Sequence, residues 1–117
     1  MNDHEKINYL ELPAKNIEAT KEFFSKTFDW QFQDYGPDYT AFSNQGLEGG
    51  FYKSDLCSVT DNGSALIVFY SNTLKVTQDK IKKNKGIIVK EIFDFPGGRR
   101  FHFTELSGNE FAVWSDK

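Results

Sequence analysis

The sequence has little cysteine, histidine and proline and no long apolar run. Its 117 residues include one cysteine, Cys57, which excludes an internal disulfide. No run approaches the ~18 apolar residues of a membrane-spanning helix, and no signal-peptide pattern follows the opening MNDHEK, so we expect a cytoplasmic protein without a membrane partner. The net charge is -3 and no broad basic patch exists, which predicts no nucleic-acid partner.

The hydrophobic content is sufficient for one core. Apolar residues make up 38% of the chain and aromatic residues 16%. Since a chain of this length supports one core and is too short for two, we predict a single domain over 1–117.

The chain repeats itself at an offset of 57 residues, which aligns YLELPAKNIEATKEFF, from Tyr9, with LIVFYSNTLKVTQDKI, from Leu66. Each copy opens with an apolar run typical of a strand. Asn16 in the first copy and Thr73, or Asn72 beside it, in the second are suitable N-caps for the helices that follow. The helices are predicted to end at Asp29 and Gly86, with Gly86 in the left-handed conformation. Further strands are predicted over 30–33, 39–43 and 49–53 in the first copy and over 87–93, 100–105 and 110–115 in the second.

This pattern predicts an α+β fold of two βαβββ modules, 6–53 and 65–117, joined by a linker over 54–64. Neither module can bury its sheet alone. We expect the two to pair into a curved, partly open, eight-stranded, barrel-like sheet with the helices outside. The concave side would enclose a ligand cavity.

Strand alternation predicts which side chains face that cavity. Phe101 and Phe103 share the face that should meet the helices, so Arg100 and His102 should point into the cavity. Glu11 and His102 are the candidate catalytic groups, because a carboxylate and an imidazole in a cleft can move a proton. The residues predicted to bind a ligand are Tyr9, Glu11, Phe51, Tyr70, Arg100, His102 and Trp114.

Structural roles for the same residues stay open. Glu11 and Arg100 could form an ion pair that fixes the sheet register, and His102 could be a hydrogen-bonded structural histidine. Glu110 follows the Gly108-Asn109 turn, where a solvated carboxylate is common.

The paired modules, with NIEATKEFFSKTFDW as first helix and FTELSGNEFAVW as closing hairpin, resemble the vicinal oxygen chelate superfamily. That superfamily includes glyoxalase I, bleomycin-resistance proteins and extradiol dioxygenases. The resemblance spans essentially the whole chain. It implies a small-molecule ligand and a homodimer.

The resemblance also implies where a metal would bind in this chain. The corresponding positions are Tyr9, Leu66, Ala112 and either Phe51 or Gly50. A divalent ion needs three or four converging N, O or S ligands, which these residues do not supply. We therefore expect no cofactor, with a divalent metal as the disfavoured alternative.

Three hypotheses follow. The first is a glyoxalase/bleomycin-resistance-like protein that binds a small organic, possibly aromatic, molecule without a metal. The second is a glyoxalase-related lyase or isomerase that uses a displaced metal site or proton transfer by His102 and Glu11. The third is a non-catalytic interaction module with a filled cavity. Whether the chain is an enzyme stays open among them.

Overall fold

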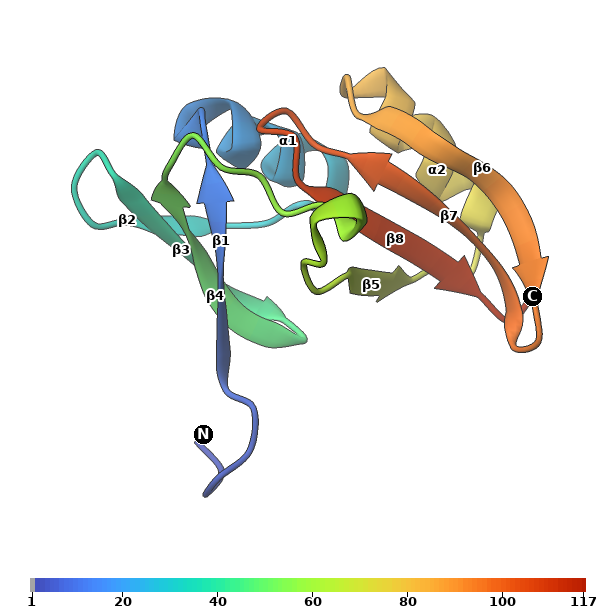
Figure 1. Cartoon of the computed structure of the whole chain (residues 1–117), viewed down its shortest axis with the longest axis horizontal. Coiled ribbons are helices and arrows are strands. Elements are labelled where there is room, and N and C mark those ends of the chain that lie inside the picture. The colour runs from blue at the N-terminus through green and yellow to red at the C-terminus, as the bar shows by residue number, and fades with distance from the viewer. Residues whose placement is uncertain (1) are drawn as a thin grey trace.

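The two halves of the chain contain the same order of elements. The computed structural model describes residues 2–117. The first half consists of β1 (Tyr9–Ala14), α1 (Ile17–Phe28), β2 (Phe32–Asp34), β3 (Tyr39–Gln45) and β4 (Leu47–Lys53). The second consists of β5 (Ile67–Tyr70), α2 (Leu74–Lys83), β6 (Ile87–Phe95), β7 (Gly98–Thr104) and β8 (Glu110–Ser115). The predicted α+β fold of two βαβββ units is confirmed (Figure 1).

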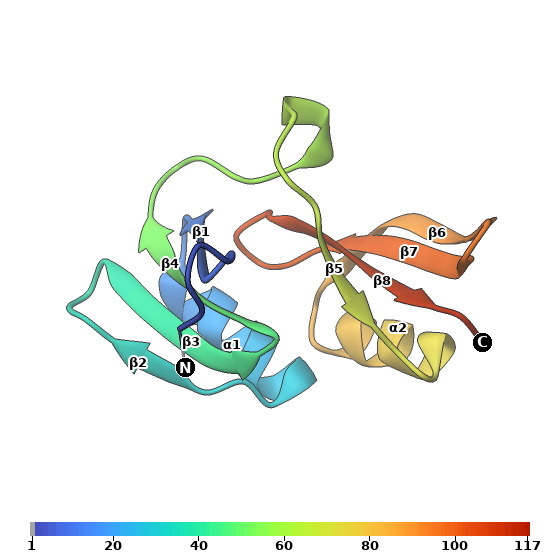
Figure 2. The ribbon, with the colours of Figure 1, turned by 90° about the horizontal axis from the view of Figure 1, so that it is seen from below.

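Each half forms its own four-stranded sheet. The strand orders are β1-β4-β3-β2 and β5-β8-β7-β6. In the first sheet β1 pairs in parallel with β4, and in the second β5 pairs in parallel with β8. The remaining pairs are antiparallel. The sheets are open and do not close into a barrel. Both helices lie on one side of them, and the linker with its short 3-10 helix η1 (Thr60–Asn62) lies on the other (Figure 2).

Helix α1 begins and ends where the sequence predicts. Asn16 accepts a hydrogen bond from the Ala19 amide through its Oδ1 at 3.0 Å, which satisfies one of the free amides of the first turn. Asp29 follows the helix in the left-handed conformation, with φ 61°, and its amide donates to the Ser25 carbonyl. An aspartate tolerates this conformation better than most residues because its short side chain is polar.

The end of helix α2 differs from the prediction. The left-handed residue is Lys85, with φ 75°, and not Gly86. A glycine is needed at 86 for a different reason, because a Cβ there would lie 2.5 Å from Cγ2 of Ile81 and 2.9 Å from a ring carbon of Phe23. The helix itself ends at Lys83, with Asn84 as its C-cap, so the predicted end at Gly86 is too late by about one turn and the predicted role of Gly86 is wrong.

Phenylalanine rings fill the space between α1 and both sheets. Phe24 is fully buried, and its ring centroid lies 5.7 Å from that of Phe51 in β4 and 5.4 Å from that of Phe111 in β8. Phe103 of β7 packs against Phe23 of α1 at 5.9 Å, and Phe101 and Phe103 are both fully buried. The predicted inward face of β7 is thus confirmed, and the two halves share one core.

Phe51 does not line an open cavity as predicted. It is fully buried within the core. The register of β4 places Phe51 beside Leu12, on the helix side of the sheet, whereas its neighbour Gly50 lies beside Glu11 on the opposite side.

The turn between β7 and β8 ties the halves together. Asn109 is fully buried, and its Nδ2 donates to the Pro13 carbonyl of β1 at 2.7 Å. Its Oδ1 accepts from the Ser58 amide of the linker at 2.8 Å. Glu105 of the same turn accepts a hydrogen bond from the Thr20 hydroxyl of α1 at 2.6 Å.

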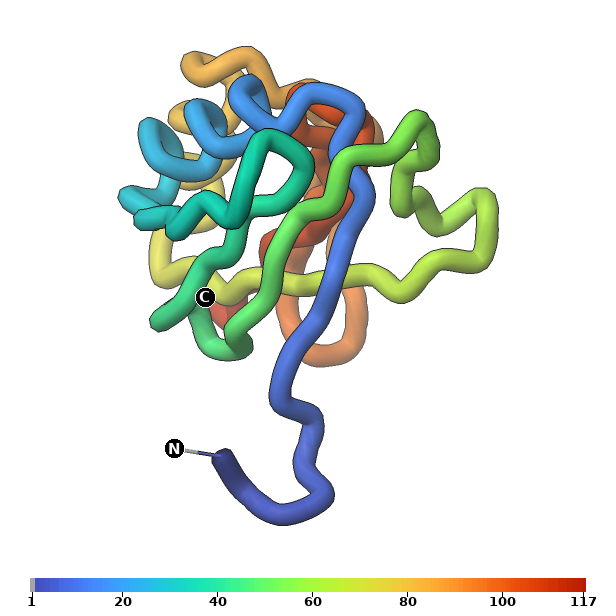
Figure 3. The backbone as a smooth tube through the Cα atoms, turned by 90° about the vertical axis from the view of Figure 1, so that its left-hand side faces the viewer, coloured from blue at the N-terminus to red at the C-terminus, as the bar shows by residue number. Residues whose placement is uncertain are grey.

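The segment before β1 extends away from both sheets (Figure 3). Within residues 2–117, no helix is both long enough and apolar enough to cross a bilayer.

Candidate functional site

The positions that the family resemblance assigns to metal ligands lie on β1, β4 and β8 and just before β5. Ala112 on β8 is fully buried, Leu66 is apolar, and Gly50 lies beneath the ring of Tyr39. Only Tyr9 carries a donor atom, and its hydroxyl is hydrogen-bonded to that of Tyr39 at 2.6 Å.

These side chains do not fit a divalent metal site. A metal of this kind requires several converging N, O or S ligands. Across residues 2–117, no group of three or more His, Cys, Asp or Glu side chains is arranged to hold an ion. The chemistry available on these strands is therefore stacking, hydrogen bonding and proton transfer by side chains.

His102 and Glu110 form a buried pair on the face of the second sheet that is turned away from the helices, here called its outer face. His102 Nδ1 lies 2.7 Å from Glu110 Oε2, and the two side chains are 2% and 8% exposed. Glu110 Oε1 accepts from the amide and the hydroxyl of Thr60 in the linker, both at 2.9 Å. The solvated carboxylate expected at Glu110 is thus wrong, because the linker covers it.

The charge of Glu110 determines which ring nitrogen of His102 carries the proton. Desolvation acts to raise the pKa of the Glu110 carboxyl, but hydrogen bonds from Thr60 and His102 outweigh it and hold that pKa below its ordinary value. An ionised carboxylate only accepts, so the proton of a neutral His102 resides on Nδ1. Nε2 is buried and has no partner among the described residues.

Arg100 belongs to an aromatic strip that crosses all four strands of the second sheet. Its guanidinium lies 5.4 Å from the ring centroid of Phe93 and 5.7 Å from that of Phe95, both on β6. Trp114 on β8 packs against Phe95 at 6.2 Å and against Tyr70 on β5 at 5.1 Å. We call these five residues the aromatic strip.

The outer face of the first sheet carries a chain of three hydrogen-bonded groups. The Tyr39 hydroxyl donates to Glu11 Oε2 at 2.9 Å and lies 2.6 Å from the Tyr9 hydroxyl. Burial, followed by the hydrogen bonds with Tyr9 and Glu11, raises the pKa of the Tyr39 hydroxyl well above its ordinary value. Tyr39 therefore keeps its proton at every physiological pH.

Gly50 makes this arrangement sterically feasible. A Cβ at position 50 would collide with the Tyr39 hydroxyl and lie 2.5 Å from its Cζ. We expect Gly50→Ala to push the Tyr39 ring off the sheet and to lower the free energy of unfolding by about 1–3 kcal/mol. Urea unfolding of Gly50→Ala and of Gly50→Ala/Tyr39→Ala measures this. A contact of 2.8 Å with the Thr40 carbonyl oxygen would remain in the double variant. Measured against Tyr39→Ala, the added cost of Gly50→Ala should therefore be smaller than in the wild type but not zero, and an equal added cost in both backgrounds would contradict the contact with Tyr39.

Three clefts border the predicted site residues. The largest, about 660 Å³, lies between β1, the linker and β5 and includes Glu11 and Leu66. A groove of about 540 Å³ on the first sheet includes Tyr9. A cleft of about 390 Å³ near the ends of α1 and β5 includes Tyr70. Arg100, His102 and Trp114 line none of these three.

The structure thus divides the predicted site into two groups. Tyr9 and Glu11 share the first sheet's outer face, and Tyr70, Arg100, His102 and Trp114 share that of the second sheet. The ion pair between Glu11 and Arg100 is not formed, since each has other partners.

Several participants were not predicted as site residues. Phe93 and Phe95 alternate along β6, a pattern that could have indicated the strip. Tyr39 and Thr60 carry no local signal, because their roles depend on sheet order and on the path of the linker.

Comparisons with known proteins agree with this fold. The family model described as Glyoxalase/Bleomycin resistance protein/Dioxygenase superfamily matches residues 6–113. No curated protein matches the chain. A glyoxalase-related enzyme from Fulvimarina pelagi superposes with a TM-score of 0.78 at 12% identity, covering 95% of this chain and 88% of the other.

Two further structures carry functional descriptions of their own. The fosfomycin resistance protein FosX from Listeria monocytogenes gives a TM-score of 0.76 at 17% identity, over 95% of this chain and 93% of its own. TnmS3, an antibiotic binding protein from Streptomyces sp. CB03234, gives 0.68 at 12% identity, over 98% of both chains. At these identities the likeness shows the fold alone.

Proposed function

The chain belongs to the glyoxalase/bleomycin resistance protein/dioxygenase superfamily, and from its side-chain chemistry we propose that it binds a small organic molecule without a metal ion. The aromatic strip of the second sheet is the main recognition surface in this proposal. An aromatic or planar ligand would stack there while Arg100 fixes its orientation. TnmS3, described as an antibiotic binding protein, is a precedent for binding within this fold.

The observation that carries the proposal is the replacement of metal ligands by hydrocarbon side chains alongside a continuous row of rings. Ala112 and Leu66 offer no donor atoms, whereas Trp114 and Tyr70, on the same two strands or their extensions, offer rings in edge-to-face contact at 5.1 Å. Each aromatic contact with a ligand adds about 0.5–1.5 kcal/mol beyond the area it buries.

The test is a thermal-shift screen with aromatic compounds on the wild type and on two strip variants. A ligand at 100 times its Kd stabilises the protein by about 2.7 kcal/mol. We expect Trp114→Ala and Arg100→Ala to remove the ligand-induced rise in Tm while each unliganded variant still unfolds cooperatively. Tyr52→Ala is the control, because Tyr52 is an exposed ring on the other sheet. Retention of the rise in Trp114→Ala would refute the strip as the binding surface.

A second candidate function is proton transfer by a glyoxalase-related lyase or isomerase. The oriented Nδ1 and the unpartnered Nε2 of His102 support it, because a carboxylate bound to one imidazole nitrogen favours proton uptake at the other. Nε2 is buried, so this function requires the side chains that cover it to move aside for a substrate. Glu11 is hydrogen-bonded to Tyr39 and is not part of that pair. Turnover in a glyoxalase assay that is lost in His102→Gln would favour this function. A third candidate, an interaction module with a filled interior, is supported by the burial of Phe51.

We also propose that the chain forms a homodimer, as the family resemblance implies. Supporting this, β1, β5 and β6 lie at sheet edges, and Ile87 and Val89 on β6 are 64% and 47% exposed. Unpaired edges of this kind are suited to pairing with another chain. Light scattering across a concentration series measures the mass.

A further inference from the structure

The groove on the outer face of the first sheet is lined by phenols and a carboxylate, with no cationic side chain from residues 2–117 in its lining. The groove of about 540 Å³ is lined on its polar side by Tyr9, Gln31, Gln33, Tyr35, Ser43 and Glu48. We call it the tyrosine groove.

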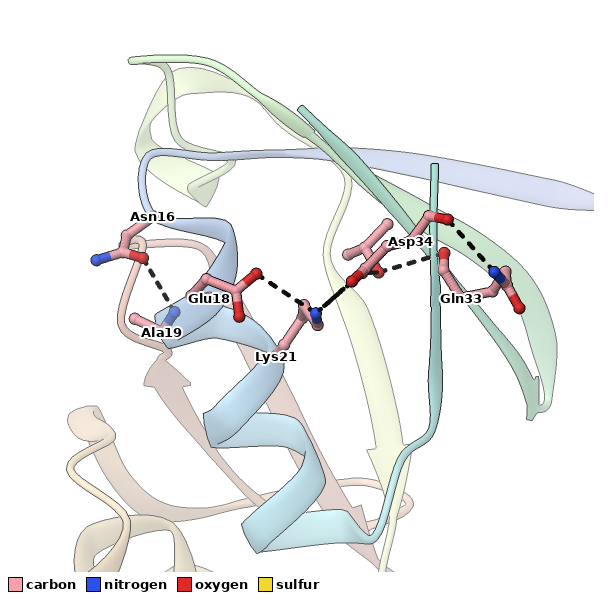
Figure 4. Close-up of polar contacts among 7 residues, drawn as sticks. Asn16, Glu18, Ala19, Lys21, Gln33 and Asp34 are labelled. Atoms are coloured by element: carbon pink, nitrogen blue, oxygen red, sulfur yellow. Dashed lines mark hydrogen bonds and ion pairs between the residues drawn. The ribbon is translucent and has the colours of Figure 1, made fainter. Parts of the chain in front are cut away.

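Two cations lie nearby, and neither lines the groove. Lys6 lines a separate cleft of about 230 Å³ that also includes Glu48, and Lys21 lies on the opposite side of the sheet. Lys21 of α1 contacts Asp34 of β2 at 2.9 Å and Glu18 at 3.4 Å (Figure 4). The Lys21 hydrogen bond is the main reason why the pKa of the Asp34 carboxyl is held below its ordinary value. This lysine is therefore occupied on the helix side and does not neutralise the groove.

The hydrogen bonds behind the groove fix the direction of the Tyr9 hydroxyl. An ionised Glu11 can only accept hydrogen bonds, so the single hydroxyl proton of Tyr39 is donated to Glu11 Oε2. The Tyr9 hydroxyl must then donate its own proton to the Tyr39 oxygen, at 2.6 Å. What Tyr9 has left to offer a ligand is an oxygen lone pair.

The groove therefore presents hydrogen-bond acceptors beside aromatic faces. Glu48 lies directly opposite Tyr9 in the β1–β4 register and adds a carboxylate at the same level. The ring of Tyr35 lies 6.4 Å from that of Tyr39, which continues the aromatic surface beyond β3. A positive charge is attracted both to such rings and to such oxygens.

From these features we infer that the tyrosine groove binds an organic cation, in particular a primary ammonium attached to an apolar or aromatic body. The ammonium donates to the Tyr9 oxygen and the Glu48 carboxylate, and the body lies against the Tyr35 ring. The site is on a different sheet from the aromatic strip, so the inference goes beyond the proposed function and does not depend on it.

The experiment compares three probes that share a phenyl ring and differ in charge. The first is 2-phenylethylamine, which is an ammonium ion at neutral pH. The second is 2-phenylethanol, which is neutral, and the third is 3-phenylpropanoate, which is an anion. Binding to the full chain is followed by NMR titration of tyrosine ring signals. We expect the amine to bind at least about fivefold more tightly than the alcohol, to weaken with added salt, and the anion to bind most weakly.

Variants locate the binding. Tyr9→Phe removes the acceptor and Glu48→Gln removes the charge, and each should lower the affinity for the amine to that of the alcohol. Tyr52→Phe is the matched control, because Tyr52 is an exposed tyrosine on the same face of β4 that does not line the groove. Trp114→Ala, in the strip, should leave amine binding unchanged.

Both exposed positions should tolerate these substitutions, so a folded variant is expected in each case and is confirmed by its melting curve. Equal affinity for the amine and the alcohol, absence of binding by every probe, or an equal loss in Tyr52→Phe would each overturn the inference. Because the strip is tested with Trp114→Ala and Arg100→Ala, failure of one site is distinguishable from failure of the other.

Discussion

Phe24→Ala is expected to lower the free energy of unfolding by about 3–5 kcal/mol, the usual cost of truncating a fully buried phenylalanine. The ring of Phe24 has no exposed surface and stacks on Trp30 at 4.4 Å. It also contacts Phe51 of the first sheet and Phe111 of the second. Its removal would therefore leave a cavity where both halves meet. Urea unfolding followed by circular dichroism measures the loss.

Two further variants distinguish the cost of the cavity from the cost of truncating any apolar side chain. Phe24→Leu keeps most of the volume and should cost less than half as much as alanine. Val76→Ala, on the exposed face of α2 at 62% exposure, should change stability by less than about 0.5 kcal/mol. If Phe24→Ala resembled Val76→Ala, the two halves would not share a core around α1.

The repeat made most of the fold predictable from the sequence. Caps, turn residues and apolar stripes are local signals, and the chain presents them twice. Asn16 and Asp29 accordingly bound α1 as expected. Alternation on β7 also assigned Phe101 and Phe103 to the core correctly. The pattern is clear there because the residues next to them on the strand, Arg100, His102 and Thr104, are polar.

Strand alternation gave the wrong face for Phe51 on β4, for a physical reason. Gly49 and Gly50 precede Phe51, and two glycines in succession give no indication of which face is which. The pairing of Phe51 with Leu12 and of Gly50 with Glu11 decides the matter, and that register is a property of the assembled sheet.

The candidate site was predictable only in parts. The outer-face positions of Tyr9, Arg100 and His102 follow from strand alternation, but their partners do not. Tyr39 reaches Glu11 across 28 residues of sequence, and Thr60 reaches Glu110 across 50. Such contacts depend on strand order and on the linker, neither of which leaves a local trace.

Glu105→Ala is expected to cost about 2–4 kcal/mol, because it leaves buried donors without an acceptor. Glu105 is 3% exposed and accepts hydrogen bonds from the Thr20 hydroxyl and from the amides of Ser107 and Asn109. Thr20 lies on α1 and the others on the β7–β8 turn, so the loss should weaken the contact between the halves. Glu105→Gln retains an acceptor oxygen and should cost less. Equal penalties in the two variants would contradict this role.

Glu105 and Glu110 should also give the protein opposite responses to pH. Burial raises the pKa of the Glu105 carboxyl against the lowering effect of its hydrogen bonds, so the folded chain binds this proton more tightly than the unfolded chain. Its contribution to stability is full below the unfolded pKa of about 4.5 and falls as the pH rises through the folded pKa. The lowered pKa of Glu110 acts the other way, so its contribution is present above that value and is lost as the pH falls.

Glutamine substitutions at the two positions isolate these responses, because glutamine does not titrate. Relative to Glu105→Gln, the wild type should lose stability as the pH rises above about 4.5. Relative to Glu110→Gln, it should lose stability as the pH falls below about 4.5. Urea unfolding at a series of pH values gives both differences. Parallel pH profiles for the wild type and both variants would show that neither carboxyl changes its proton affinity on folding. They would also show that the Thr60 hydrogen bonds to Glu110 do not favour the ionised carboxylate.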